Sequence, residues 1–126
     1  MKLLVIFALC VVSSFSLELQ TVSNFDEAIK QAKQKNKNLL VFMHSEHCPW
    51  CTKMKDTTLK DTETIEFINN RYIFVSLDKD TDKYPKHLKP EIIPTTYLID
   101  QNTQDIKYTL YGYKPTEYLI NELWDE

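Results

Sequence analysis

Glycine is nearly absent, since the 126-residue sequence contains only Gly112. A loop that wraps a phosphate group with backbone N–H groups needs several glycines, so the sequence excludes a glycine-rich nucleotide site. Long runs of basic residues are also missing, and the formal net charge is −3. Because proteins that bind nucleic acid carry a basic face, we expect no nucleic-acid partner.

No apolar run approaches the length of about 20 residues that crosses a bilayer. The longest run covers residues 3–12 and follows a basic second residue. Ser14 and Ser16 then place small residues at positions −3 and −1 of a cleavage site. This layout is typical of a secretory signal peptide, and an uncleaved anchor is the alternative. We predict a signal peptide over residues 1–16 and one domain over residues 17–126. The mature protein is expected to be exported to the periplasm or secreted, without membrane insertion after cleavage.

Cysteine is scarce, with three in the sequence. Cys10 lies inside the apolar run 3–12, which we expect to be removed when the signal peptide is cleaved. The other two, Cys48 and Cys51, are separated by two residues. An exported protein meets conditions in which disulfides form and persist. A bridge across so short a loop adds little to fold stability, so the pair indicates chemistry rather than a structural staple.

Hydrophobic periodicity predicts alternating helices and strands over the rest of the chain. The expected helices run from Ser23 or Asn24 to Lys35, from Pro49 to Lys60, after Asp61 or Thr62, around Lys86–Leu88, and from Pro115 onward. The expected strands cover residues 39–43, 72–77, 95–99 and 106–111, and residues 17–22 form an extended arm. Buried strands separated by helices pair in parallel, and a late hairpin adds an antiparallel edge. The predicted fold class is α/β, a mixed central sheet with helices on both faces.

Cys48 is expected just beyond a buried strand, at the start of the helix that Pro49 opens. The first turn of a helix has unpaired N–H groups and a partial positive charge, which lower the pKa of a thiol placed there. Cys51 lies one turn further on, within reach of Cys48 but less exposed. We predict that Cys48 attacks a substrate disulfide and that Cys51 resolves the resulting mixed disulfide.

Two motifs carry a family resemblance. Cys48-Pro49-Trp50-Cys51 follows the apolar run LLVFM, and Ile92-Ile93-Pro94-Thr95 precedes a later strand. Together with the leading helix and the Gly112 that precedes the last helix, this order resembles the thioredoxin superfamily over nearly all of residues 17–126. The segment HCPWCTKM, residues 47–54, is most similar to the exported, periplasmic-type members of this superfamily in bacteria.

The resemblance implies a thioredoxin-like fold and a cis Ile93–Pro94 bond that faces Cys48 and Cys51. It also implies that an extended substrate segment pairs with the backbone before Pro94 and contacts Trp50 and Ile93. The implied activity is that of a thiol–disulfide oxidoreductase without a cofactor, which reduces or isomerises disulfides. Its partners would be disulfide-containing or dithiol proteins and a redox partner that recycles the two cysteines.

Phe42 departs from the family pattern. Thioredoxins have a buried aspartate at this position, six residues before the first cysteine, where it aids proton transfer to the second cysteine. Here water, Glu46 or a histidine has to serve instead. His47, if protonated, would lower the pKa of Cys48 further, and Pro49 between the cysteines also tunes it. The alternative for His47 is an exposed loop residue with little effect.

Two rival functions use the same residues. The pair could be a dithiol oxidant that introduces disulfides, or part of a non-catalytic module that holds a metal or a partner. His44, His47, Cys48 and Cys51 match zinc in number, but adjacent ligands at His47 and Cys48 strain a tetrahedral site. We therefore predict no metal site.

The remaining aromatic residues are expected to have structural roles. Tyr108, Tyr111 and Tyr113 alternate along and beyond the last expected strand, which indicates packing on the sheet. Trp124 lies on the apolar side of the last helix and is expected in the core.

Overall fold

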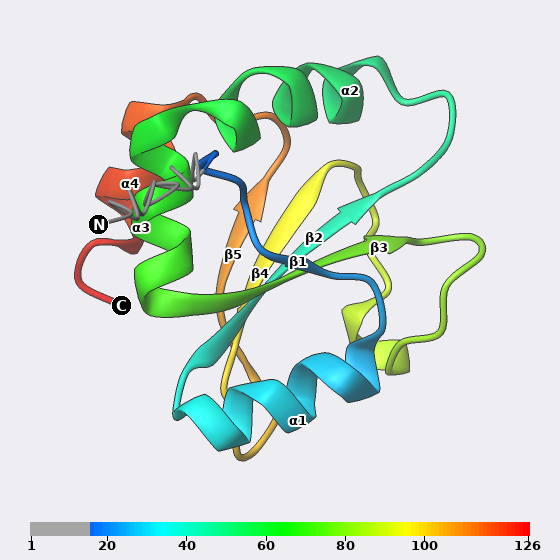
Figure 1. Cartoon of the computed structure of the whole chain (residues 1–126). Coiled ribbons are helices and arrows are strands. Elements are labelled where there is room, and N and C mark those ends of the chain that lie inside the picture. Colours follow the sequence, from blue (N-terminus) through cyan, green and yellow to red (C-terminus); the bar gives the residue numbers. More distant parts are fainter. Residues whose placement is uncertain (1–15) are drawn as a thin grey trace, which may run out of the picture.

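A computed structural model describes residues 16–126, so the predicted signal peptide lies outside the described residues except for Ser16. Five strands form one mixed sheet in the order β1-β3-β2-β4-β5 (Figure 1). β2 pairs in parallel with β3, β3 with β1, and β4 is antiparallel to both β2 and β5. The strands are β1 Thr21–Val22, β2 Asn38–His44, β3 Tyr72–Asp78, β4 Thr95–Ile99 and β5 Ile106–Tyr111. The predicted α/β class with a mixed sheet is confirmed.

The helices begin where the sequence supplies caps. Asn24 accepts a hydrogen bond of 2.9 Å from the N–H of Glu27 at the start of α1, and Asp61 accepts one of 2.9 Å from Glu63 at the start of α3. Such side-chain acceptors satisfy N–H groups that the first turn leaves unpaired. The helices are α1 Phe25–Lys35, α2 Pro49–Asp56, α3 Thr62–Arg71 and α4 Thr116–Leu123, with 3₁₀ turns η1 Thr58–Lys60 and η2 Lys86–Leu88.

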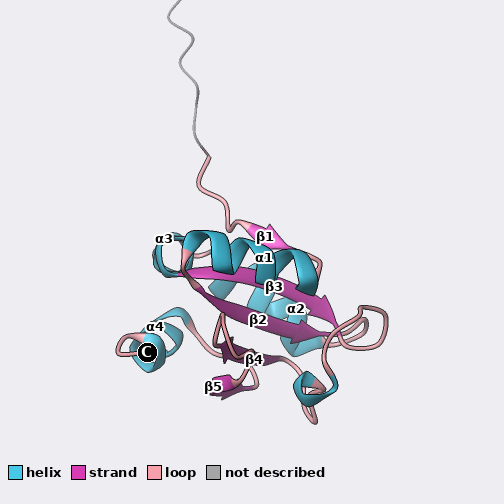
Figure 2. Ribbon diagram, turned by 90° about the horizontal axis from the view of Figure 1, so that it is seen from below, coloured by secondary structure: helices cyan, strands magenta, loops and turns pink. Residues whose placement is uncertain are grey.

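The sheet separates two hydrophobic cores. α1 covers one face, and α2, α3 and α4 cover the other (Figure 1). Figure 2 shows the same layers from below, with α1 on the near side of β2 and β3 and α2 beyond them. Side chains along β2 alternate between the cores: Leu40 and Phe42 face α2, whereas Leu39, Val41 and Met43 face α1. This alternation explains why residues 39–43 form an uninterrupted apolar run.

The first strand is an addition to the predicted elements. Residues 17–22 were expected to be an extended arm, and Thr21 and Val22 pair with Phe74 and Val75 of β3. Asn69 of α3 fixes the arm, because it accepts a 3.0 Å hydrogen bond from the N–H of Gln20 and donates a 2.8 Å bond to the carbonyl of Glu18.

The helix after the cysteines is shorter than predicted. It ends at Asp56 rather than Lys60, and η1 follows. The Thr57 hydroxyl donates a 2.6 Å hydrogen bond to the Lys53 carbonyl, which is also the acceptor for the Thr57 N–H. A threonine hydroxyl that competes for a carbonyl in this way favours a helix end.

The core assignment of Trp124 is wrong. Its side chain is 57% exposed at the end of α4. Its ring stacks on Phe67 with centroids 6.0 Å apart, and the Arg71 guanidinium lies 4.7 Å from its centroid. Leu119, Ile120 and Leu123 already fill the buried side of the helix, so the ring covers the outside of the core. Within residues 16–126 no helix is both long and apolar enough to cross a membrane.

Candidate active site

Cys48 occupies the N-cap position of α2, four residues after the end of β2. The chain turns between the two elements with His47 in the left-handed region at φ 59°. Pro49 takes the first helical position, where its fixed φ fits and its missing N–H leaves no hydrogen bond unmade. Cys48 forms a disulfide with Cys51, and their Cα atoms are 5.2 Å apart.

The two sulfurs lie in different environments. Cys51 is 1% exposed and belongs to the core under α2, whereas Cys48 is half-buried at its edge. The N–H of Cys51 donates a 3.2 Å hydrogen bond to Sγ of Cys48. When the bridge is reduced, this N–H and the helix N-terminus stabilise a thiolate on Cys48. Only the outer sulfur therefore combines access with stabilisation of its anion.

Ile93 packs against the same core as Cys48, and Pro94 follows it. Their peptide bond is cis, as the resemblance implies. The N–H of Gly112 donates a 2.7 Å hydrogen bond to the Pro94 carbonyl, which joins the end of β5 to the residue before β4. A cavity of about 330 Å³ opens here, and its lining residues are Trp50, Ile93, Pro94, Gly112 and Tyr113.

Trp50 and Tyr113 form an aromatic pair beside this cavity. Trp50 is 56% exposed, and its ring centroid is 5.7 Å from that of Tyr113. The ammonium group of Lys53 lies 5.0 Å from the Trp50 centroid and 4.8 Å from the Tyr113 centroid. Both distances are within the range of cation–π attraction.

The expected sheet packing of three alternating tyrosines is wrong for two of them. β5 ends at Tyr111, which is 61% exposed, and Tyr113 lies beyond the strand against Trp50. Tyr108 does pack against the core, and its hydroxyl donates a hydrogen bond to the carboxylate of Glu122 in α4. The sequence signal that separates Tyr113 from the strand is Gly112, whose φ of 76° turns the chain away.

Phe42 is fully buried in the same core as Cys51. In register, it pairs with Ser76 of β3 on one side and with Thr96 of β4 on the other, so two hydroxyl-bearing residues flank it. Thr96 is 2% exposed, and its Oγ1 is a buried polar atom without a hydrogen-bond partner within the described part of the chain. Within residues 16–126, neither register partner of Phe42 carries a carboxylate that could replace the family's aspartate.

His44 is the histidine that packs against Phe42. Its ring is stacked on the phenyl ring with centroids 5.7 Å apart, and Nζ of Lys55 lies 3.2 Å from its Nδ1. Burial, and then the charge of Lys55, lower the pKa of His44, while Asp78 and Asp82 act in the opposite direction. The ring is therefore neutral near pH 7, and Lys55 donates to Nδ1.

His47 and Glu46 lie on the surface of the loop before Cys48. The His47 side chain is 91% exposed, and its Nε2 is 3.8 Å from Oε1 of Glu46. Tuning of Cys48 by His47 stays a prediction. Among residues 16–126, no three His, Cys, Asp or Glu side chains are grouped as metal ligands would be.

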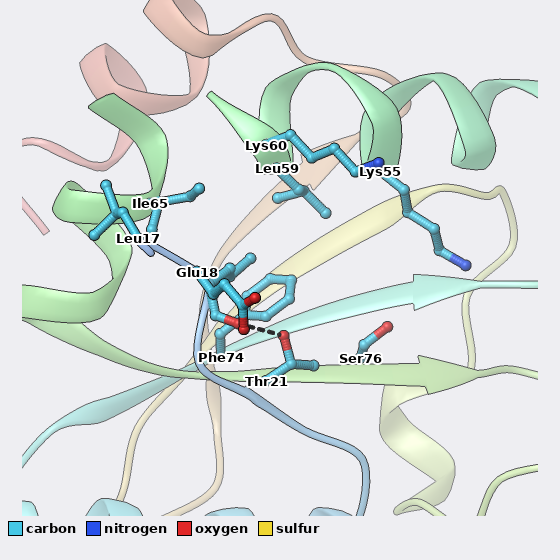
Figure 3. Close-up of a pocket in the computed structure, with 10 residues that line it drawn as sticks. Leu17, Glu18, Thr21, Lys55, Leu59, Lys60, Ile65, Phe74 and Ser76 are labelled. Atoms are coloured by element: carbon cyan, nitrogen blue, oxygen red, sulfur yellow. Dashed lines mark hydrogen bonds between the residues drawn. The ribbon is translucent and has the colours of Figure 1, made fainter. Parts of the chain in front are cut away.

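A larger cavity lies elsewhere. It has a volume of about 550 Å³ and lies between the N-terminal arm, η1 and β3, where neither cysteine lines it (Figure 3). Leu17, Leu59 and Phe74 supply apolar walls, and the Thr21 hydroxyl donates a 3.1 Å hydrogen bond to the Leu19 carbonyl at its rim. The smaller cavity is the one next to the cysteines in sequence, because Trp50, which lines it, lies two residues after Cys48.

A comparison with known families matches residues 25–125 to the thioredoxin-like domain. The chain belongs to the thioredoxin-like domain family. Anterior gradient protein 3 of Mus musculus is 27% identical over 109 residues, which cover 79% of this chain and 65% of that protein. The chain thus spans slightly less than two thirds of that relative's length.

Solved structures show the same thioredoxin-like fold. A thioredoxin from Thermus thermophilus superposes with a TM-score of 0.74 at 23% identity, covering 86% of each chain. A putative disulphide-isomerase from Bacteroides thetaiotaomicron gives a TM-score of 0.70 at 21% identity, covering 86% of this chain and 90% of that one. This chain therefore combines a thioredoxin-like fold with a CxxC pair within disulfide distance.

Proposed function

We propose that this protein is a thiol–disulfide oxidoreductase that reduces or isomerises disulfides of exported proteins. The observation that carries the proposal is the asymmetry of the pair at the start of α2. Cys48 is accessible and accepts a hydrogen bond from the N–H of Cys51, whereas the Cys51 side chain is buried. One sulfur is thus suited to attack a client, and the other is kept for resolution.

The reaction transfers two electrons to the client. The Cys48 thiolate attacks one sulfur of a client disulfide, a Cys48–client bond forms, and the second client sulfur leaves as a thiolate that takes a proton from solvent. Cys51 then loses its proton and attacks Sγ of Cys48, which releases the first client thiol and forms the Cys48–Cys51 disulfide. A dithiol redox partner returns the pair to the reduced form. Isomerisation ends instead with attack by a client thiol on the mixed disulfide.

The surrounding residues take supporting roles in this scheme. Trp50, Ile93 and Pro94 contact the client, because they line the cavity beside Cys48. Pro49 and His47 tune the pKa of Cys48 from the helix start and the preceding turn. No resident cofactor is needed, since the electrons pass between sulfur atoms.

The export part of the proposal rests on the N-terminal sequence. Residues 1–16 act as a signal peptide, and residues 17–126 form one thioredoxin-like domain that works in the periplasm or outside the cell. A CxxC pair in such a compartment meets clients whose disulfides persist.

Insulin reduction by the wild type, Cys48→Ser and Cys51→Ser tests the activity. We expect both variants to lose turnover, and Cys51→Ser to accumulate a mixed disulfide through Cys48 in the native compartment. Variants as active as the wild type would reject a redox role and favour a module that binds a metal or a partner.

A dithiol oxidant is the second candidate, because thiol–disulfide exchange at the same Cys48–Cys51 pair can run in either direction. The equilibrium reduction potential separates the two directions. A potential near −270 mV, that of thioredoxin, supports reduction, and one near −120 mV, that of a strong oxidant, supports oxidation.

A further inference from the structure

Within the described part of the chain, the ammonium group of Lys53 has no acidic partner, and it lies beside the cavity lined by Trp50 and Tyr113. Among residues 16–126, three ion pairs form, and Lys53 belongs to none of them. Its ammonium group is held instead by the faces of Trp50 and Tyr113, at 5.0 Å and 4.8 Å from their centroids. An ammonium that lies over aromatic rings still has N–H groups free to bind an anion.

Lys53 also lies beside the surface to which the proposed function assigns client binding. Tyr113 and Trp50, the two rings that hold it, line the cavity formed with Ile93 and Pro94. Lys53 lies five positions after Cys48, which is a rise of about 7.5 Å along the helix axis and a rotation of about 140° around it. Its side chain extends back toward the start of the helix, because its ammonium group lies 5.0 Å from the ring centroid of Trp50, two positions after Cys48. Two residues of an extended segment cover about 6.6 Å and place both side chains on the same face.

We propose that Lys53, positioned by Trp50 and Tyr113, selects client segments that carry a carboxylate two residues from the attacked cysteine. This inference rests on the proposed oxidoreductase activity and names its substrate class. The rings provide an apolar wall for the client backbone and its side chains, and Lys53 provides the ion pair. The formal net charge of the whole chain is −3, so this local charge opposes the average of the molecule.

Symmetrical disulfide-linked peptides test the selection, because attack on either sulfur is then equivalent. The peptides carry Glu, Gln or Lys at the second residue before or after the cysteine, and the second-order rate of their reduction is measured. For one of the two positions we expect the wild type to reduce the Glu peptide about threefold faster than the Gln peptide, as for a partly exposed ion pair. The preference should weaken at high ionic strength.

Variants separate the charge from the fold. Lys53→Met should lower the Glu-to-Gln rate ratio to about one, and Lys53→Arg should retain it, because both exposed ion pairs are of similar strength. Lys114→Met is the matched control, since Lys114 lies 4.6 Å from the Tyr118 centroid in the same kind of contact, and the ratio should not change.

Three results would overturn the inference while leaving the oxidoreductase intact. They are equal wild-type rates for Glu and Gln peptides at both positions, a ratio that survives Lys53→Met, and faster reduction of the Lys peptides than of the Gln peptides. The last would mean that the rings bind a client cation. Failure of the wild type to reduce any peptide would reject the proposed function together with this inference.

Discussion

At the scale of single residues, the residue at position 42 of β2 distinguishes this chain from the family pattern. Phe42 fills the place of an acid, and Ser76 and Thr96 flank it in register. Of the groups that the sequence suggested for proton transfer, His44 is the one stacked on Phe42, while Glu46 lies on the surface beside His47. The polar groups that pair with Phe42 in register or stack on it are therefore two hydroxyls and an imidazole rather than a carboxylate.

Replacement by valine should change the free energy of unfolding in opposite directions at two neighbouring threonines of β4, Thr95 and Thr96. Thr96 Oγ1 is buried without a partner, so Thr96→Val removes an uncompensated hydroxyl and should raise the free energy of unfolding by about 1 kcal/mol. Thr95 donates a 2.6 Å hydrogen bond to the Ile92 carbonyl, so Thr95→Val should lower it by about 1–3 kcal/mol. Urea unfolding of both variants checks this, and a loss of stability in Thr96→Val would contradict it.

The environment of His44 makes stability depend on pH. Because its pKa in the folded protein is lowered, the unfolded chain, in which a histidine pKa is about 6.5, binds more protons at mildly acidic pH. Stability therefore falls as pH drops from about 7.5 to about 5.5. His44→Gln should flatten this dependence, as measured by urea unfolding across the range.

His87 supplies the control for that measurement. Its ring is exposed, with Nε2 at 2.9 Å from the Gln104 carbonyl. His87→Gln is the matched variant in which an imidazole is replaced at an exposed position. An equal slope in His44→Gln and the wild type would show that another group causes the dependence.

At the scale of elements, side chains fix the position of both ends of α2. Cys48 caps its start with sulfur and Pro49 fills its first position, so the helix begins at the reactive residue. At its other end, the Thr57 hydroxyl donates a hydrogen bond to the Lys53 carbonyl. The ammonium group of the same lysine lies over the ring of Tyr113, which lines the cavity. Cys48, Cys51 and Lys53 thus all lie on α2 or at its N-cap.

The N-terminal arm depends on one side chain of α3. Asn69→Ala removes the two hydrogen bonds to the backbone of Glu18 and Gln20, so we expect faster amide exchange at the arm and at β1. The free energy of unfolding should fall by about 1 kcal/mol. Asn70→Ala, at an exposed neighbouring position, is the control and should leave exchange unchanged. Hydrogen-exchange mass spectrometry decides, and equal protection in both variants would contradict the assignment.

At the scale of the whole molecule, the sheet separates the redox-active cysteines from one of the two hydrophobic cores. The core under α2 contains Cys51, whereas the core under α1 contains neither cysteine. Stability is shared between the two cores, but only one of them touches the redox pair. Substitutions of equal size on the two faces should therefore differ in function more than in stability.

A pair of methionines permits that comparison. Met54 and Met43 are both fully buried, the first in the core with Cys51 and the second on the opposite face. Each Met→Ala change should lower the free energy of unfolding by about 2–5 kcal/mol. Only Met54→Ala should also change the reduction potential, measured by equilibration with a glutathione buffer. A similar change in potential for Met43→Ala would mean that the sheet does not separate the cores.

Local sequence determined the elements and the position of the reactive cysteine. The apolar run 39–43 predicts a buried strand and Pro49 predicts a helix start, because periodicity and fixed φ act over a few residues. Together they placed Cys48 at a helix N-terminus, and the motif around Pro94 implied the facing cis bond. The structure contains both features.

Tertiary structure alone decided which distant side chains meet. Tyr113 and Trp50 are 63 positions apart and lie on segments that only the packed sheet brings together. The exposure of Trp124 and the pairing of β1 with β3 depend likewise on surfaces formed by other elements. Such contacts have no local signal, since they arise from long-range burial of apolar surface rather than from backbone preference.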